Sequence, residues 1–387
     1  TQVRAMANLS PTDAANGAFS PARPYHPVAV IGAGAWGTAL AATLRRAGRD
    51  VRLWGRDRGV LDAINAEAEN PSYLPGVALP PGIRATASLK TALAGAEAGI
   101  VVVPSGSIRT VLRQMSAHLP PGIPLAVCAK GIEDGTGLLM TQVAEDTVPD
   151  HAMGVISGPT FARETALNHP TAATVAFPFA YKDRLNPNES AAARFAVTLS
   201  TEAFLTYISD DVVGVEVGGA VKNVIAIACG MMTGAGFAEN TRAALITRGV
   251  DEMKALAEAL GGRRETVTGL SGIGDLALTC SSTTSRNMSL GHQLGQGLAR
   301  RACFEGRPVV VEGERNAKAV TDVARRVGVS MPIAEAVRAI LHDGAPLGET
   351  FAAHWARPIE AEPRTMDLSF AHPATPGAVA NLADRIS

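Results

Sequence analysis

The sequence predicts an N-terminal α/β domain with a mostly parallel sheet, followed by an all-α C-terminal domain. The first prediction rests on short apolar runs that alternate with helix-length segments up to about residue 211, a pattern typical of βαβ units. The second rests on the C-terminal half of the chain, where strand-like runs disappear and long helical stretches dominate. A length of 387 residues also exceeds what one compact core usually holds, so two domains are expected.

The strands are predicted from apolar runs, taken in chain order. Residues 28–31 read Val-Ala-Val-Ile and lead through a glycine-rich turn into a helical pattern that begins near Ala35. Further apolar runs of strand length lie at 51–54, 100–103, 125–128, 155–156 and 174–177. We expect these runs to extend the same sheet, because helix-length segments separate the earlier ones.

The helical half is predicted from stretches with helical periodicity. They cover residues 211–232, 240–260, 287–299, 312–327 and 332–342. The chain then divides into a disordered lead, a sheet domain, a helical domain and a loose tail, at residues 1–26, 27–211, 212–362 and 363–387. The polar segment 178–190 is rich in Pro and Asn, and we expect a surface loop there.

The composition disfavours several function classes. The formal net charge of -1 provides no broad positive surface for nucleic acid or an anionic membrane. The four cysteines form no CxxC pair, so we expect reduced thiols in a cytoplasmic protein rather than a zinc site or disulfides. The N-terminal segment has no apolar core typical of a signal peptide. The apolar stretch 212–238 carries Glu216 and Lys222, which favours a buried core helix over a membrane span.

A glycine motif follows the first expected strand. Gly32, Gly34 and Gly37 form a G-x-G-x-x-G that opens a helix, the context in which this motif binds a dinucleotide. The first glycine permits a tight turn, and the second lets the backbone approach the pyrophosphate at the helix N-terminus. A purely structural glycine turn is the alternative. We therefore predict a Rossmann domain.

The end of the second strand bears on which nicotinamide cofactor binds. An NAD site usually has an acidic side chain about 20 residues beyond the glycines, and Asp57 comes slightly late for that role. Arg56 could pair with the 2′-phosphate of NADP through its planar guanidinium. We favour NADP over NAD, with a solvated surface arginine as the alternative.

Two lysines are candidates for chemistry. Lys130 follows a buried strand at its carboxyl end, where open α/β sheets bind ligands, although a loop lysine is more often simply solvated. Lys222, followed by Asn223, lies within a long apolar helix. Since burial of an unpaired ammonium is costly, Lys222 needs a partner, a ligand or a lowered pKa, unless it extends to solvent. A lowered pKa would suit proton transfer near neutral pH.

A third polar group lies further along the chain. Asp275 closes the glycine-rich segment GLSGIGD and could cap the helix that begins after it. Ser285, Arg286 and Asn287 lie where another helix is expected to begin. A hydroxyl, a guanidinium, an amide and helix N–H groups together indicate a phosphate site for a small molecule.

With these residues in view, the chain resembles the bacterial-type NAD(P)-dependent sn-glycerol-3-phosphate dehydrogenase family. The segments that carry the resemblance occur in family order between about residues 27 and 362: IGAGAWGTAL, CAKGIE, SGPTFARE, GGAVKNVIAIACGM, AALITRG, GLSGIGDLALTC, SRN and VVEG. The resemblance implies an N-terminal Rossmann domain, a C-terminal helical domain and an active site between them. It also implies a role in supplying glycerol 3-phosphate for phospholipid synthesis.

The resemblance assigns roles to single positions. Lys222 resembles the family's general base, with Lys130 and Asp275 as its partners around the reacting oxygen. Thr160 stands where the family usually has serine and keeps the hydroxyl. Positions similar to substrate contacts are Lys130, Gly158, Thr160, Lys222, Asn223, Asp275, Ser285, Arg286 and Asn287. Positions similar to cofactor contacts are Gly32, Gly34, Ala35, Trp36, Gly37, Arg56, Lys130, Ala162, Arg286, Val310 and Glu312.

Other functions stay open at this point. A Rossmann dehydrogenase of the 3-hydroxyacid or 6-phosphogluconate type shares the architecture but lacks GLSGIGDLALTC followed by SRN. A non-catalytic dinucleotide-binding sensor would keep the glycine motif and lose the lysines and the aspartate, all of which are present. We expect no metal, because a lysine can polarise the carbonyl. The oligomeric state is open between a monomer and a homodimer.

Overall fold

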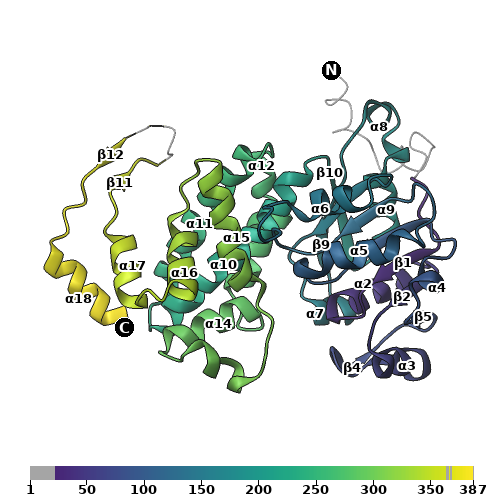
Figure 1. Cartoon of the computed structure of the whole chain (residues 1–387), viewed down its shortest axis with the longest axis horizontal. Coiled ribbons are helices and arrows are strands. Elements are labelled where there is room, and N and C mark those ends of the chain that lie inside the picture. Colours follow the sequence, from purple (N-terminus) through teal and green to yellow (C-terminus); the bar gives the residue numbers. More distant parts are fainter. Residues whose placement is uncertain (1–21, 363–365, 367, 387) are drawn as a thin grey trace.

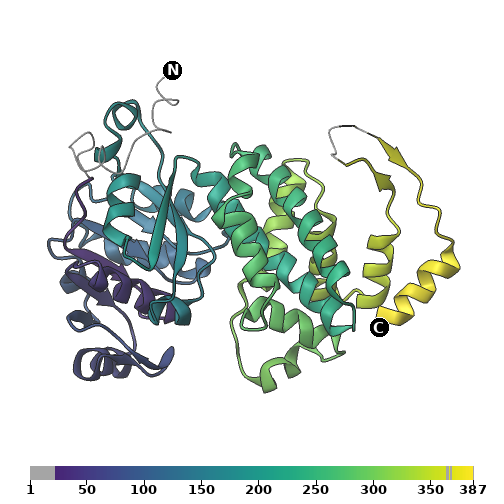
Figure 2. The ribbon, with the colours of Figure 1, turned by 180° about the vertical axis from the view of Figure 1, so that it is seen from behind.

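The computed structural model describes residues 22–362, 366 and 368–386. An α/β domain and a helical domain lie side by side, as the sequence predicts (Figure 1). The view from behind shows the C-terminal segment at the end of the helical domain farthest from the sheet (Figure 2). The predicted fold class is confirmed.

One eight-stranded sheet organises the first domain. Its spatial order is β10-β9-β8-β7-β6-β1-β2-β5. The bounds are β1 (Val28–Ile31), β2 (Val51–Trp54), β5 (Ile83–Thr86), β6 (Ala98–Val101), β7 (Leu125–Val127), β8 (Met153–Ser157), β9 (Thr171–Ala176) and β10 (Phe204–Ser209). The six neighbouring strands β5, β2, β1, β6, β7 and β8 all run parallel. The strand order reverses at β1, because β2 and β5 lie on one side of it and β6 to β10 lie on the other. Ligands of doubly wound sheets bind at such a reversal, beyond the carboxyl ends of the strands.

Helices cover both faces of this sheet, since separate hydrophobic clusters line its two sides. These helices are α2 (Ala35–Arg46), α3 (Arg58–Glu67), α4 (Leu89–Leu93), α5 (Ile108–Ser116), α6 (Met140–Thr147), α7 (Ala162–Ala166), α8 (Tyr181–Leu185) and α9 (Ala191–Leu199). A small ribbon, β3 (Glu69–Asn70) with β4 (Leu74–Ala78), packs beside α2 and α7. Short 3₁₀ turns at Ser105–Ser107 and Pro187–Glu189 complete the domain.

The second domain is built around one long helix, α10 (Val212–Gly234), which contacts most of the other helices. These are α11 (Glu239–Ala259), α12 (Arg264–Val267), α13 (Asp275–Cys280), α14 (Arg286–Gly295), α15 (Glu312–Arg326), α16 (Pro332–His342), α17 (Leu347–Trp355) and α18 (Pro376–Ile386). A π-helical turn, Leu270–Gly274, precedes α13, a 3₁₀ segment spans Arg300–Gly306, and β11 (Ile359–Glu360) pairs with β12 (Ser369–Phe370).

Helix α10 is the connection between the two cores. By length and composition it could cross a membrane, but 89% of its most apolar window is buried inside the protein, as expected for a core helix. Val215, near its start, belongs to the core under the sheet, whereas Val221 and the turns after it belong to the helical core. A side chain in between therefore lies at the junction of the two domains.

Several predictions about individual segments are wrong. Run 174–177 extends the sheet as predicted, but its direction differs from the parallel one expected: β9 pairs antiparallel with β8 and parallel with β10. Segment 178–190 is exposed for most of its length but contains α8 and a 3₁₀ turn instead of a plain loop. Helix 287–299 ends at Gly295. Strands β5 and β10 were not predicted. β5 (Ile-Arg-Ala-Thr) has few apolar residues, whereas the apolar and aromatic residues of β10 (Phe-Leu-Thr-Tyr-Ile-Ser) are a strand signal that was overlooked.

Both ends of the chain also differ from the prediction. The disordered lead was expected to reach residue 26, and its first 21 residues lie outside the described part. Tyr25, however, is buried, and its ring lies 5.0 Å from that of Phe195. The tail was expected to be loose, yet α18 packs on the helical core through Leu382 and Ile386, which share a face at helical spacing.

Candidate active site

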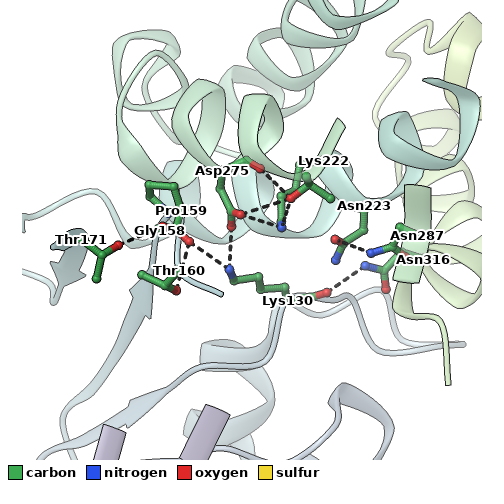
Figure 3. A network of polar contacts seen from close by, with 11 residues as sticks. Lys130, Gly158, Pro159, Thr160, Thr171, Lys222, Asn223, Asp275, Asn287 and Asn316 are labelled. Carbon is green, nitrogen blue, oxygen red and sulfur yellow. Dashed lines mark hydrogen bonds and ion pairs between the residues drawn. The ribbon is translucent and has the colours of Figure 1, made fainter. Parts of the chain in front are cut away.

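The site is assembled where the helical domain meets the carboxyl edge of the sheet (Figure 3). Lys130 lies in the loop after β7, and Gly158 directly follows β8. Lys222 extends from α10, and Asp275 begins α13. Segments that lie 145 residues apart in the sequence thus meet at one point.

Asp275 joins the two lysines. Its Oδ1 accepts a hydrogen bond from Lys222 Nζ at 2.7 Å, and its Oδ2 accepts one from Lys130 Nζ at 2.5 Å. Lys130 Nζ also donates to the carbonyl oxygen of Gly158 at 3.3 Å. Lys222 and Asp275 are 6% and 2% exposed, so the charged pair is shielded from water. The predicted partner of the buried lysine is therefore a carboxylate.

The electrostatics of this cluster favour a lysine that can release its proton. Burial lowers the pKa of Lys222 from its usual value; Asp275 opposes this effect, and the positive charge of Lys130 reinforces it. Burial by itself would raise the pKa of Asp275, but the two ammonium groups outweigh it and keep that pKa below its usual value. Asp275 therefore stays ionised while it holds both lysines.

Thr279 is a member of the site that was not predicted from the sequence. Its hydroxyl oxygen accepts from Lys222 Nζ at 2.7 Å and donates to the Asp275 carbonyl oxygen one turn earlier in α13. The spacing of four residues places both side chains on one helix face, which is the signal that could have identified it. The suggested capping role of Asp275 is wrong, because its carboxylate binds the lysines and α13 has no side-chain cap.

A cavity of about 180 Å³ opens beside Lys222. Asn287 donates from Nδ2 to Oδ1 of Asn223 at 2.9 Å and accepts from the Gly313 N–H at 2.9 Å. Ser285 caps α14 through a bond from the Met288 N–H, as the predicted helix start implies. Residues that line the cavity are Lys130, Phe161, Lys222, Asn223, Thr279, Thr284, Ser285, Arg286, Asn287 and Glu312.

Arg286 and Glu312, both predicted cofactor positions, line the same cavity as the lysines. Arg286 Nη1 donates to the carbonyl oxygen of Val310 at 2.9 Å, which fixes the guanidinium next to the cavity. Burial raises the pKa of Glu312, while Arg286 and the two lysines pull it down. Phe161, which was not predicted, supplies an apolar wall to the same cavity.

The glycine turn has the shape that a dinucleotide requires. Gly32 has φ of +127°, and a Cβ there would lie 2.2 Å from the carbonyl oxygen of Val102. A Cβ at Gly37 would lie 1.8 Å from the carbonyl oxygen of Gly32, so α2 packs directly on the turn. A Cβ at Gly34 would meet no atom within 4 Å, and α2 begins without a side-chain cap. Helix N–H groups that face open space fit a pyrophosphate.

The remaining predicted cofactor positions divide into two groups. Ala35, Trp36 and Ala162 lie together, because all three pack against one small apolar cluster between α2 and α7. Arg56 is exposed just beyond β2, and Asp57 caps α3 through a bond from Val60. Asp57 is thus occupied by a structural role, which leaves Arg56 as the candidate charge at the strand end.

Gly158 and Thr160 lie together beside the lysines. The Thr160 hydroxyl lies 3.3 Å from the Gly158 carbonyl oxygen, the same oxygen that binds Lys130. Among the residues that the structure describes, no three His, Cys, Asp or Glu side chains gather as a metal site. All four cysteines are free and buried.

Comparison with known proteins identifies the family. The family models for the N-terminus and C-terminus of NAD-dependent glycerol-3-phosphate dehydrogenase match residues 27–181 and 211–352. A glycerol-3-phosphate dehydrogenase [NAD(P)+] of Rhodospirillum rubrum is 48% identical over 87% of this chain and 93% of its own length. One from Maricaulis maris is 46% identical over 87% of this chain and 98% of its own length.

A solved structure agrees with these sequences. The glycerol-3-phosphate dehydrogenase of Coxiella burnetii is 36% identical and superposes with a TM-score of 0.78, covering 86% of this chain and 99% of its own. The yeast enzyme, 24% identical with a TM-score of 0.74, shares the fold. The glycine turn, the two lysines and the aspartate lie within the two matched regions. The chain therefore belongs to the NAD-dependent glycerol-3-phosphate dehydrogenase family.

Proposed function

We propose that this protein is an sn-glycerol-3-phosphate dehydrogenase (NAD(P)+) in which Lys222 is the general base. The observation that carries the proposal is a buried lysine held by a carboxylate whose other oxygen binds a second lysine. This cluster lies at the edge of the sheet where Rossmann enzymes bind their ligands.

Lys222 would take the proton from the C2 hydroxyl of glycerol 3-phosphate. Its lowered pKa increases the neutral fraction that can accept a proton near neutral pH. In the reverse direction, the ammonium form would protonate the oxygen that develops from the carbonyl of dihydroxyacetone phosphate. Thr279 and Asp275 keep Nζ in place through two hydrogen bonds of 2.7 Å.

Lys130 and Asp275 would tune that proton transfer. The ammonium of Lys130 lowers the pKa of Lys222 by repulsion and can polarise the reacting oxygen. Asp275 binds both lysines and partly opposes the shift. Fixed charges in a site shielded from water act more strongly than they do in solution.

The cofactor would be held by the glycine turn and its surroundings. The α2 N-terminus at Gly34 would bind the pyrophosphate, with Ala35, Trp36 and Ala162 along one side. The bound nicotinamide supplies the hydride acceptor or donor of the reaction. We favour NADP, because Arg56 is exposed at the strand end and its guanidinium suits a 2′-phosphate.

The substrate phosphate would bind where the start of α14 lines the cavity. Ser285, Arg286 and Asn287 are adjacent there at the start of α14, where helix N–H groups favour an anion. Gly158, Thr160 and Asn223 would line the rest of the substrate path. A phosphate held away from C2 aligns the reacting carbon and gives selectivity against unphosphorylated glycerol.

We further propose a cytoplasmic enzyme that supplies glycerol 3-phosphate for phospholipid synthesis. Four free, buried thiols suit a reducing compartment. A homodimer is proposed as one of two assembly states, with the monomer as the other, and sedimentation of the purified protein distinguishes them.

The activity is tested by absorbance at the reduced-nicotinamide band. Purified protein with dihydroxyacetone phosphate should deplete NADPH rapidly and NADH more slowly, and omission of the substrate provides the control. Equal rates with both cofactors would contradict the role of Arg56. Folded protein that binds NADPH but depletes neither cofactor would contradict the proposed activity and favour a non-catalytic sensor.

A further inference from the structure

Asn316 lies next to the two lysines without touching the cavity. It is on the second turn of α15 and is 1% exposed. Its Nδ2 donates to the carbonyl oxygen of Lys130 at 2.8 Å (Figure 3). The same nitrogen also donates to the carbonyl oxygen of Ala220 at 3.1 Å. Both hydrogens of one buried amide are therefore used on main-chain oxygens.

These two oxygens belong to the segments that carry the lysines. One is the carbonyl of Lys130 itself, in the loop after β7 of the sheet domain. The other lies two residues before Lys222, on α10. The packing around the amide is tight, since a Cβ at Gly131 would lie 3.1 Å from Asn316 Oδ1 and 2.8 Å from the Cβ of Ser105. The loop therefore has little freedom to shift while Asn316 is in place.

We propose that Asn316 is a positioning residue that sets the spacing of Lys130 and Lys222 around Asp275. This inference rests on the proposed role of Lys222 as general base. On this proposal, α15 has two roles. Its first turn carries Glu312 at the cavity and the Gly313 N–H that binds Asn287, and its second turn carries Asn316. Helix α15 thus contacts the side-chain amide of Asn287, a predicted substrate position, and also both segments that carry the lysines.

The spacing matters because the charge on Lys222 depends on its neighbours. Groups whose charge acts on Lys222 are Asp275, Lys130 and Glu312. The buried thiol of Cys280 carries no charge, because its pKa lies well above the ordinary value. Without the amide, the Lys130 loop gains freedom and the mean distance between the two ammonium groups increases. Repulsion then weakens, and Lys222 keeps its proton to higher pH. The acidic limb of the rate profile for glycerol 3-phosphate oxidation should therefore move to higher pH.

The test uses Asn316→Leu, which keeps most of the side-chain volume and removes both donors. We expect kcat to fall about 10- to 100-fold, the range caused by a misplacement of about 1 Å, with little change in the KM for NADP. The acidic limb should move up by about half a pH unit or more. Asn316→Gln, which keeps an amide donor, should recover part of the activity and of the profile.

The matched control is Thr321→Val on the same helix. Thr321 is fully buried, and its hydroxyl bonds the Ala317 carbonyl oxygen and Arg338, away from both lysines. This variant should lower Tm without moving the pH profile. If Asn316→Leu does not fold, Asn316→Ser replaces it, with the same expected shift.

An unchanged kcat and pH profile in the donor-free variant would overturn the inference. So would a decline that matches Thr321→Val in kind, with lower stability and no shift in the profile. Lys222→Met separates this failure from that of the proposed function. If Lys222→Met is inactive and Asn316→Leu is normal, only the positioning role is wrong; if Lys222→Met is active, the proposed general base is wrong.

Discussion

The glycine turn and the two-lysine site are built in opposite ways. The turn is made by six consecutive residues, from Gly32 to Gly37, and its shape follows from close main-chain contacts within that segment and with Val102. The two-lysine site takes Lys130, Lys222 and Asp275 from separate elements of both domains. The shape of the glycine turn therefore depends mainly on local sequence, whereas the two-lysine site depends on how the two domains pack together.

This difference predicts which properties fail together. A change at Gly32 or Gly37 should affect cofactor affinity and the folding of the first domain together, because the same close contacts serve both. A change at Lys222 should affect turnover and its pH dependence and leave cofactor affinity intact. The two ends of the active site can therefore be perturbed separately.

The largest effect is expected from Gly37→Ala. Its Cβ would lie 1.8 Å from the Gly32 carbonyl oxygen, so α2 must move away from the turn. We expect loss of measurable NADPH binding in a fluorescence titration, a lower Tm and no detectable turnover. Gly34→Ala should keep its Tm, because no atom lies within 4 Å of the new methyl group, yet lose affinity where the pyrophosphate binds. Gly59→Ala, with only an ordinary contact at 3.4 Å, serves as the neutral control. Equal Tm losses in the Gly34 and Gly37 variants would contradict this account.

Asp275→Asn should have the next largest effect. It leaves two ammonium groups without their shared counter-charge, and loss of one partner in a buried ion pair costs about 3–5 kcal/mol of unfolding free energy. We expect kcat to fall about 100-fold, a size typical of lost electrostatic preorganisation. Because Asp275 raises the pKa of Lys222, its removal should move the acidic limb of the oxidation profile to lower pH. That direction is opposite to the one expected for Asn316→Leu.

The control for this charge change is Asp146→Asn, at an ion pair with Arg109 on the surface. Exposed pairs contribute about 0–1 kcal/mol, so stability and the pH profile should barely change. A shift of the Asp275→Asn profile to higher pH would show that the carboxylate does not act on Lys222 in the way the contacts imply.

The smallest effect is expected at Glu216, on the α10 turn that packs against the sheet domain. Its carboxylate accepts from the main-chain N–H of Thr141 at 3.0 Å and from that residue's hydroxyl, at the start of α6. Burial raises its pKa to about 7, against the opposing hydrogen bonds from Thr141. A raised carboxyl pKa means that its contribution to stability is complete below about pH 4.5 and is lost as pH rises through about 7.

Glu216→Gln should therefore flatten the pH dependence of Tm between about pH 4.5 and 7, by a few degrees at most. Thermal melts across this range measure the change, and turnover at the optimum should fall less than for Asp275→Asn. If the variant instead lost the same amount of Tm at every pH, Glu216 would stabilise the fold through its hydrogen bonds to Thr141 and not through its titration.

The same contrast explains what the sequence could predict. The turn was predicted residue by residue, since a strand, three glycines and a helix lie in one short segment. Lys222 was predicted as a buried lysine with a partner, because an isolated charge in an apolar helix requires one. The identity of that partner came from the family resemblance and from the structure. Asn316 was missed, since its role depends on which helices pack together. Thr279 was missed although its spacing of four residues from Asp275 was a usable signal.

Errors in the fold have a similar cause. β9 has an apolar sequence that fits a strand, but its antiparallel direction depends on the chain path after Gly158 and not on its residues. Helix α18 was missed because the segment before it has no sustained period, although its own apolar residues recur at helical spacing. The capping role suggested for Asp275 failed because a π-helical turn precedes α13 and directs the carboxylate to the lysines.

The central claim is tested most directly by kcat and NADPH affinity measured together in Lys222→Met, which keeps the length of the side chain and removes its charge. The account predicts that kcat falls about 10²- to 10⁴-fold, the usual contribution of a general acid or base, while the Kd for NADPH stays within about twofold of the original value. Near-normal turnover in this variant, with the fold intact, would contradict the assignment of proton transfer to Lys222.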